Sequence, residues 1–264
     1  MKERALIIAK ELLAIWDEST VKLLPAHLAF FSVLSIAPVL IILFFAAQYF
    51  SLPIEKLLSP LESSLPDAIL ALFAPTEQKA STMSVGIWLI VALFIGSNGL
   101  NSLITGSDSL YGFEGPNVIA KRLKAVLLTL ILVIIVLFGV AIIALSEYLI
   151  GFISGDMQGF IAALRWVLLI ILAFTGVKFA YMTAVSKRIP SRDTNKGTLV
   201  TICGWIIAFA MYGFYYANFS NYNELYGALA NIIVLMILAY ILSTIFVIGM
   251  IVNVYQYRKY SASP

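Results

Sequence analysis

The sequence predicts an all-α integral membrane protein: a bundle of six transmembrane helices with an N-terminal amphipathic helix and short outer-loop helices. Three observations lead to this fold class. Hydrophobic residues make up 61% of the 264 residues and charged residues only 12%, whereas about 25% charged residues are usual in soluble domains. The mean hydropathy is +0.98. Long stretches contain no Asp, Glu, Lys or Arg, and each is long enough for the roughly 20 residues of a spanning helix.

Residues 1–22 are predicted to form a cytoplasmic amphipathic helix at the membrane interface. Apolar residues such as Leu13 and Trp16 alternate there with charged residues such as Lys10 and Glu11 at roughly helical spacing. The charged residues also interrupt any apolar stretch that could serve as a signal peptide.

The six-span transmembrane domain is predicted to cover residues 23–257. Its spans coincide with the charge-free stretches, because a charge at the centre of a bilayer is costly. The fourth span is interrupted only by Arg165 near its start and Lys178 near its end. The predicted spans are residues 26–50, 84–104, 125–149, 162–185, 198–217 and 226–254.

The outer loop, residues 52–83, is the largest predicted segment outside the membrane. Ser59-Pro60 and Leu65-Pro66 are typical of the starts of short helices with proline at the first helical position. We expect these helices to cap the bundle or to lie on the outer leaflet. The chain ends in a predicted cytoplasmic tail, residues 258–264.

Most of the 17 Lys and Arg residues lie on one side of the predicted spans, and the loops of the other side hold only Lys56 and Lys79. Because cytoplasmic loops carry the excess of Lys and Arg, both termini are predicted to be cytoplasmic, in the cell inner membrane. The basic residues match lipid headgroups, so the net charge of +3 gives no indication of nucleic-acid binding.

Several short motifs carry a resemblance to a known family. They are the stretch from Ala26 to Pro38, Lys121-Arg122-Leu123, Gly204-Trp205, Tyr226-Gly227-Ala228-Leu229, and Gly249 with Asn253. In this order they resemble the YihY/BrkB family of six-span bacterial membrane proteins, also called ribonuclease BN-like, over nearly the whole chain. One departure is Ile251, which stands where the family usually has an acidic residue.

The sequence offers little for catalysis. It has one histidine, His27, and one cysteine, Cys203, which excludes paired-His metal sites, Cys-based zinc sites and disulfides. Phosphodiester hydrolysis generally needs clustered carboxylates that hold metal ions, or histidines that act as acid and base. We therefore predict a protein that is not an enzyme and has no catalytic residue, metal or cofactor. The resemblance implies that the ribonuclease name is a historical misassignment.

Polar residues within the spans predict a cavity in the cytoplasmic half of the bundle. Lys178 lies roughly 10 Å inside the fourth span at 1.5 Å per residue. Its ammonium either reaches back to the headgroups or faces this cavity. The candidate substrate-binding residues are Lys178, Asn98, Asn101, His27 and Asn253.

Four residues are candidates for a kink or a gate. Pro38 lacks the N–H that would bond the carbonyl of Leu34, so the first span is expected to bend there, and Ser35 can bond the freed backbone. The bend either lines a substrate path or improves packing. Glu147 and Arg165 end the third and fourth spans at similar depth; they form either a salt bridge within that hairpin or an outer gate.

Together these features predict a transporter or exporter that moves a small polar solute or an amphiphile through a polar cavity between helices. The expected partners are membrane lipid and this unknown solute, and a homo-oligomer is left open. The alternative is a lipid-handling or scaffold protein of the cell envelope without solute transport. Candidate residues that line one cavity would favour transport, whereas the same residues turned outward or packed without water would favour the scaffold.

Overall fold

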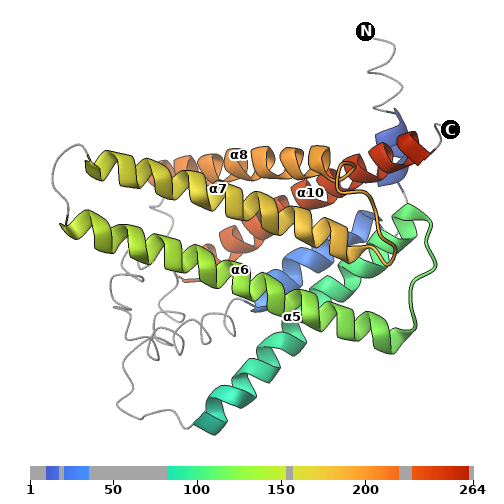
Figure 1. The fold of residues 1–264 in the computed structure, drawn as a ribbon, viewed down its shortest axis with the longest axis horizontal. Helices are drawn as coiled ribbons and strands as arrows, with labels where there is room; N and C mark the ends of the chain where they lie inside the picture. Colours follow the sequence, from blue (N-terminus) through green and yellow to red (C-terminus); the bar gives the residue numbers. More distant parts are fainter. Residues whose placement is uncertain (1–9, 18–20, 36–81, 153–156, 220–227, 262–264) are drawn as a thin grey trace.

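The computed structural model describes residues 10–17, 21–35, 82–152, 157–219 and 228–261 (Figure 1). In these ranges every regular element is a helix, so the all-α prediction is confirmed for the described part of the chain. Two short helices cover residues 10–16 and Val21–Ser35. The long helices are α5 (Thr82–Tyr111), α6 (Val118–Phe152), α7 (Met157–Ala184), α8 (Asn195–Phe219) and α10 (Ala228–Ser261).

Four of the described helices are long and apolar enough to cross a membrane. They are Val118–Phe152, Met157–Ala184, Asn195–Tyr215 and Ile233–Lys259, which overlap the predicted third to sixth spans. The helix α5 covers the predicted second span. Residues 36–81, with most of the first predicted span and the outer loop, lie outside the described part. The protein is therefore a multi-pass membrane protein, and the count of six spans stays a prediction.

Local sequence signals set the ends of these helices. The helix α5 is followed by Gly112, whose φ of 70° lies in the left-handed region that glycine adopts without strain. The helix α6 begins after Asn117, whose side-chain oxygen accepts a hydrogen bond of 2.9 Å from the N–H of Ala120, as an N-cap residue does. At the start of α8 the carbonyl of Thr194 accepts the N–H of Thr198 at 3.1 Å.

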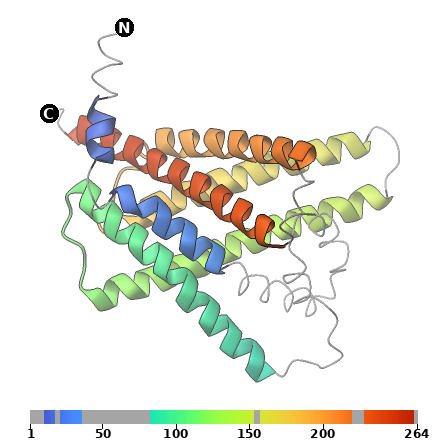
Figure 2. The ribbon, with the colours of Figure 1, turned by 180° about the vertical axis from the view of Figure 1, so that it is seen from behind.

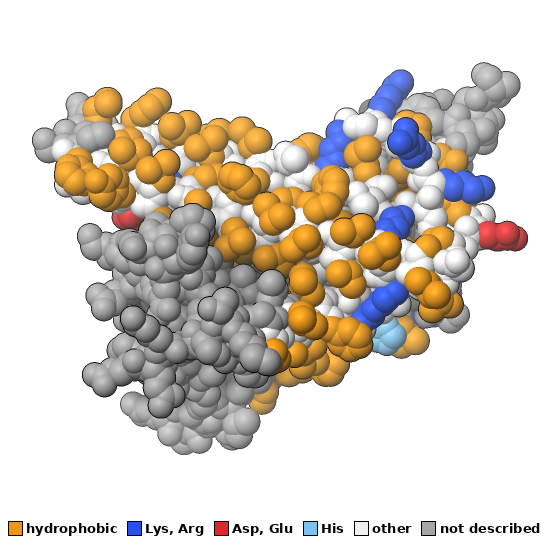
Figure 3. Space-filling view, turned by 60° about the horizontal axis from the view of Figure 1, so that its bottom comes forward, with side chains coloured by type: hydrophobic (Ala, Val, Ile, Leu, Met, Phe, Trp, Pro, Cys, Tyr) orange, Lys and Arg blue, Asp and Glu red, His pale blue; other side chains and the backbone are white. Residues whose placement is uncertain are grey.

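The helices bring several connections to one end of the molecule. The loops after α5 and after α7, the C-terminal end of α10 and helix 10–16 lie together there in both ribbon views (Figures 1 and 2). We call this end the basic end. In Figure 3 most Lys and Arg side chains gather towards it, while hydrophobic side chains cover much of the remaining described surface. The basic end corresponds to the side that the distribution of charges predicts to be cytoplasmic.

The hydrophobic core lies in the halves of the helices nearest the basic end. It joins Leu24 of the helix Val21–Ser35 to Leu103 of α5, Val177 of α7 and Met250 of α10. Ile15 of helix 10–16 is buried in the same core, with Leu12 and Trp16 packed against it. Leu13, predicted to lie on the apolar face of this helix, is 65% exposed, because residues at positions i, i+3 and i+4 share one face and Leu13 lies outside that set.

The prediction that the basic end is cytoplasmic can be tested by cysteine labelling. In a Cys203→Ser background, Lys187→Cys is expected to react with a membrane-impermeant maleimide only after the cells are opened, because basic loops are retained inside. Glu62→Cys, in the predicted outer loop and outside the described residues, is expected to react in intact cells. Labelling of position 187 in intact cells would contradict the predicted topology.

Candidate functional site at the basic end

The five predicted substrate-binding residues lie on four helices and have different surroundings. His27 is exposed on the helix Val21–Ser35, and Asn98 and Asn101 are half-buried on α5. Lys178 is half-buried on α7, and Asn253 of α10 is completely buried. None of the five lines either of the two pockets described below.

Asn98 takes part in a contact between α5 and α6. Its side-chain oxygen accepts a hydrogen bond of 2.7 Å from Arg122. The guanidinium of Arg122 also donates to the carbonyl of Phe94 at 3.4 Å and lies 4.5 Å from the centre of that ring. Arg122 therefore ties α6 to α5. The sequence analysis used Arg122 only as part of a family motif and as a basic residue on one side of the spans, because nothing in the sequence indicates which residue the guanidinium bonds.

Asn253 belongs to a tightly packed contact among α7, α8 and α10, which we call the glycine junction. It consists of Gly197, Thr201, Gly249, Tyr181 and Asn253. The side-chain oxygen of Asn253 accepts the N–H of Gly197 at 2.8 Å, and its amide nitrogen has no partner among the described atoms. The hydroxyls of Tyr181 and Thr201 lie 2.6 Å apart, and Tyr181 donates to the carbonyl of Phe246 at 2.6 Å. These bonds hold three helices together.

Lys178 lies at the edge of the buried face of α7. That face consists of Gly176, Val177, Ala180, Tyr181 and Ala184. The position of Lys178 is three residues before buried Tyr181 and next to buried Val177, and its own side chain is half-buried. No described residue forms a hydrogen bond or ion pair with it. This placement leaves both alternatives for Lys178 open, the headgroups and a cavity.

The structure describes three of the four residues that were predicted to form a kink or a gate. Arg165 forms an ion pair with Glu147 and also lies 3.5 Å from the hydroxyl of Ser146, so this pair joins α6 to α7 away from the basic end. A gating role for the pair stays a prediction. Pro38 lies outside the described residues, and the hydroxyl of Ser35 donates to the carbonyl of Ser32 at 2.9 Å.

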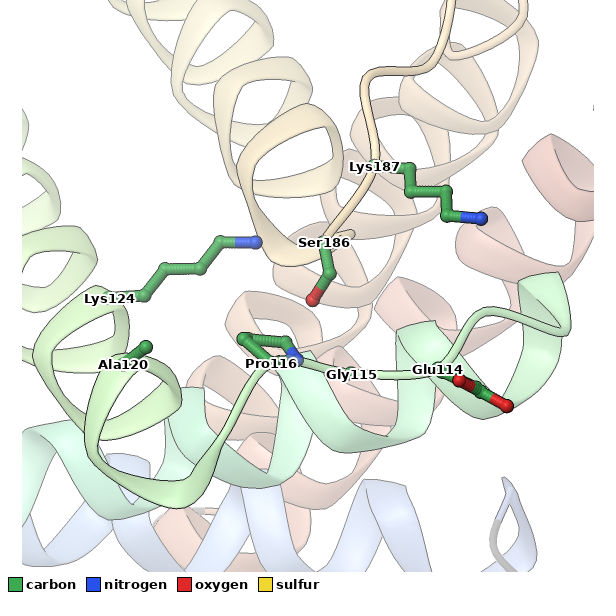
Figure 4. A pocket seen from close by; sticks show the side chains of 7 residues that line it. All are labelled: Glu114, Gly115, Pro116, Ala120, Lys124, Ser186 and Lys187. Atoms are coloured by element: carbon green, nitrogen blue, oxygen red, sulfur yellow. The ribbon is translucent and has the colours of Figure 1, made fainter.

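An open pocket of about 430 Å³ lies at the basic end, between the loop after α5 and the turn after α7 (Figure 4). Its lining residues are Glu114, Gly115, Pro116, Ala120, Lys124, Ser186 and Lys187. We call it the basic-end pocket. In Figure 4 the side chain of Lys124 extends from α6 towards the end of α7, with Ser186 beside it, and Lys187 and Glu114 lie on the opposite side. A second pocket, of about 510 Å³, is formed by apolar residues of α8 such as Met211 and Phe214.

A buried carboxylate fixes one wall of the basic-end pocket. Asp108 of α5 is only 3% exposed, and its two oxygens accept hydrogen bonds from the backbone N–H of Ser186 at 2.7 Å and from the Ser186 hydroxyl at 2.6 Å. Because a buried carboxylate is stable only when it is hydrogen-bonded or paired, this double contact anchors the turn after α7 to α5. The sequence analysis did not select Asp108 as a candidate residue, because its partner Ser186 is 78 residues away in the chain.

A lysine fixes the other wall. The ammonium of Lys124 donates to the carbonyl of Val185 at 2.7 Å and to that of Ala184 at 3.5 Å. These carbonyls belong to the end of α7, where a helix leaves carbonyls without partners and a positive charge is favourable. The pocket therefore has a preformed frame that couples three helices. Among the described residues, no group of three or more His, Cys, Asp or Glu could hold a metal ion.

Comparisons with a family model and with known proteins agree on one family. Residues 12–264 match the family described as virulence factor BrkB. The ribonuclease-like protein YfkH of Bacillus subtilis (strain 168) is 28% identical over 249 residues, which cover 89% of either chain. No solved structure is significantly similar to the chain. The resemblance noted in the sequence is thereby confirmed, and the chain belongs to the BrkB virulence factor family of membrane proteins.

Proposed function

We propose that this protein is a transporter or exporter that moves a small polar solute or an amphiphile across the cell inner membrane, and that this molecule enters at the basic-end pocket. The observation that carries the proposal is the pocket itself. It is open, it lies at the basic end, and two lysines, a serine and a glutamate line it.

A second lysine, Lys178, lies further along α7, the helix whose end Lys124 contacts. Lys178 is six residues before Ala184, the last residue of α7, which corresponds to roughly 9 Å along a helix. Lys124 contacts the end of α7, so Lys124 and Lys178 lie at two different positions along this helix. Ionisable residues at membrane depth commonly mark substrate pathways, and this arrangement supports a path that begins at the pocket and continues along α7.

The alternative, a lipid-handling or scaffold protein without solute transport, also has support. Asn98 and Asn253 are engaged in contacts between helices rather than lining either described pocket. His27 is exposed. These three candidates therefore favour the scaffold, whereas the basic-end pocket favours transport.

A flux assay distinguishes the two functions. Purified protein in liposomes loaded with osmolytes or small organic acids is expected to release at least one solute faster than protein-free liposomes. The Lys178→Met variant is expected to slow that release about tenfold, the effect of losing one charge-assisted contact, while it folds normally because the apolar stem is retained. Asn101→Leu is expected to have a smaller effect.

Lys22→Gln is the matched control, because Lys22 is exposed at the basic end and pairs with Asp17 at 2.7 Å. Its flux is expected to equal that of the wild type. If no solute moves, and Lys178→Met changes neither thermal stability nor growth under osmotic stress, the scaffold replaces the transporter.

A further inference from the structure

We propose that the basic-end pocket binds an anionic phosphoryl group, either the head of an acidic phospholipid or a soluble phosphoester. This inference rests on the proposed function, because it names the chemical class of the molecule that enters there. It is carried by three lysines and by the hydrogen-bonding capacity that the surrounding protein leaves unused.

The three lysines come from two segments of the chain. Lys121 and Lys124 are three residues apart on α6 and therefore share a face of that helix. Lys124 lines the pocket, and Lys187 lines it from the turn after α7. A β-carbon built on Gly115 would lie 2.9 Å from the ammonium of Lys121 and 2.9 Å from Oδ2 of Asp108, so both groups closely approach the backbone that forms the pocket wall.

The ammonium groups have N–H donors that the surrounding protein does not use. A lysine ammonium has three N–H donors, and the carbonyls of Ala184 and Val185 take up two of those of Lys124. The ammonium of Lys187, on an exposed side chain, lies 4.9 Å from the centre of the Phe113 ring. Among the described residues, no carboxylate lies within 4.0 Å of either ammonium. An anion in the pocket would accept hydrogen bonds from these donors in place of water.

The carboxylates near the pocket do not cancel this charge. Asp108 directs both oxygens to Ser186, and Glu114 is exposed at the opposite side of the pocket from Lys124. Three lysines against these two carboxylates leave an excess of one positive charge. A phosphodiester carries one negative charge and several acceptor oxygens, so it matches both the excess charge and the free donors.

The position and the size of the pocket agree with a phosphoryl head. Lys124 is six residues after Val118, the first residue of α6, and thus roughly 9 Å along a helix that goes on to span the membrane. Basic pockets between transmembrane helices, near their cytoplasmic ends, bind lipid headgroups. A volume of about 430 Å³ is within the range of about 300–1,000 Å³ typical of small-ligand sites.

A binding experiment on the full chain in detergent tests this site. Thermal unfolding is followed during titration with dioctanoyl phosphatidylglycerol, with dioctanoyl phosphatidylcholine, and with glycerol 3-phosphate. Phosphatidylglycerol is expected to stabilise the protein more than phosphatidylcholine, which has the same chains but no net charge. Lys187→Gln is expected to weaken this binding about tenfold, the effect of losing one charge-assisted contact, and Lys22→Gln is expected to leave it unchanged.

Lys124→Met should weaken binding further, but it also removes the contact to the end of α7. Lys187→Gln therefore carries the test if Lys124→Met does not fold. Binding of phosphatidylglycerol without binding of glycerol 3-phosphate supports a lipid head as the source of the phosphoryl group. Binding of both supports a soluble phosphoester. Equal binding of the two lipids, or an unchanged affinity in Lys187→Gln, would overturn the site.

The same variant separates this inference from the proposed function. If Lys187→Gln loses phosphoryl binding and the wild type moves no solute, the site stands as a lipid-binding site and transport falls. If solute moves and flux is unchanged by Lys187→Gln while no phosphoryl compound binds, transport stands and the phosphoryl site falls.

Discussion

Replacing Gly197 by alanine is expected to lower the free energy of unfolding by about 3 kcal/mol, at the upper end of the usual cost of overpacking. A β-carbon at Gly197 would overlap the carbonyl of Gly249 and the side-chain oxygen of Asn253. Both obstacles belong to α10, and one of them is backbone that cannot move away by a change of rotamer. The helices α8 and α10 would therefore have to separate, and the bond between Asn253 and the N–H of Gly197 would be lost.

The matched control is Gly213→Ala on the same helix. A β-carbon there meets nothing within 4 Å, and alanine is a better helix former than glycine by about 1 kcal/mol. This control is expected to keep or slightly raise stability. Reversible unfolding in mixed detergent measures both variants. If the two variants were equally stable, α8 and α10 would not approach each other as closely as the glycine junction requires.

The second large effect is expected for Asp108→Ala, with a loss of about 3 kcal/mol, because hydrogen bonds to a charged group contribute about 1.5–3 kcal/mol and buried donors left without a partner are costly. The change removes the acceptors for the N–H and the hydroxyl of Ser186. The turn after α7 would lose its anchor on α5. We expect the same variant to weaken binding of phosphatidylglycerol, because the wall that carries Lys187 is no longer fixed.

Two further variants serve as a conservative replacement and as a control for Asp108→Ala. Asp108→Asn keeps the shape and one acceptor oxygen, so its loss of stability is expected to be about half as large. Glu114→Gln removes a negative charge from the same loop at an exposed position and is expected to leave stability unchanged within about 0.5 kcal/mol. A stability of Asp108→Ala equal to that of Glu114→Gln would refute the anchoring role of Asp108.

Much of the helical architecture followed from the charges alone. A described helix overlaps each predicted span from the second to the sixth, because charged residues are excluded from the membrane interior and end each apolar stretch. The predicted limits of 125–149 lie inside Val118–Phe152. The difference arises because the helix extends back to its N-cap, Asn117, whereas the predicted span began only after the last charged residue, Lys124.

The candidate site was predicted less well. The prediction selected polar residues inside the spans, among them Asn98, Asn101, Asn253 and Lys178, because amides and charges are costly in lipid. It could not distinguish an amide that lines a cavity from one that bonds another helix. Asn98 bonds Arg122 and Asn253 bonds Gly197, and in both cases the partner is distant in the sequence or on another helix.

Composition and local order along the chain are sufficient to predict the membrane class, the family resemblance, the position of most helices and the concentration of basic residues on one side. Which polar groups meet depends instead on how the helices pack. The contact of Asp108 with Ser186 and that of Lys124 with the end of α7 join segments that are 78 and 61 residues apart in the chain. Their formation depends on the angles at which α5, α6 and α7 pack, and no local pattern encodes those angles.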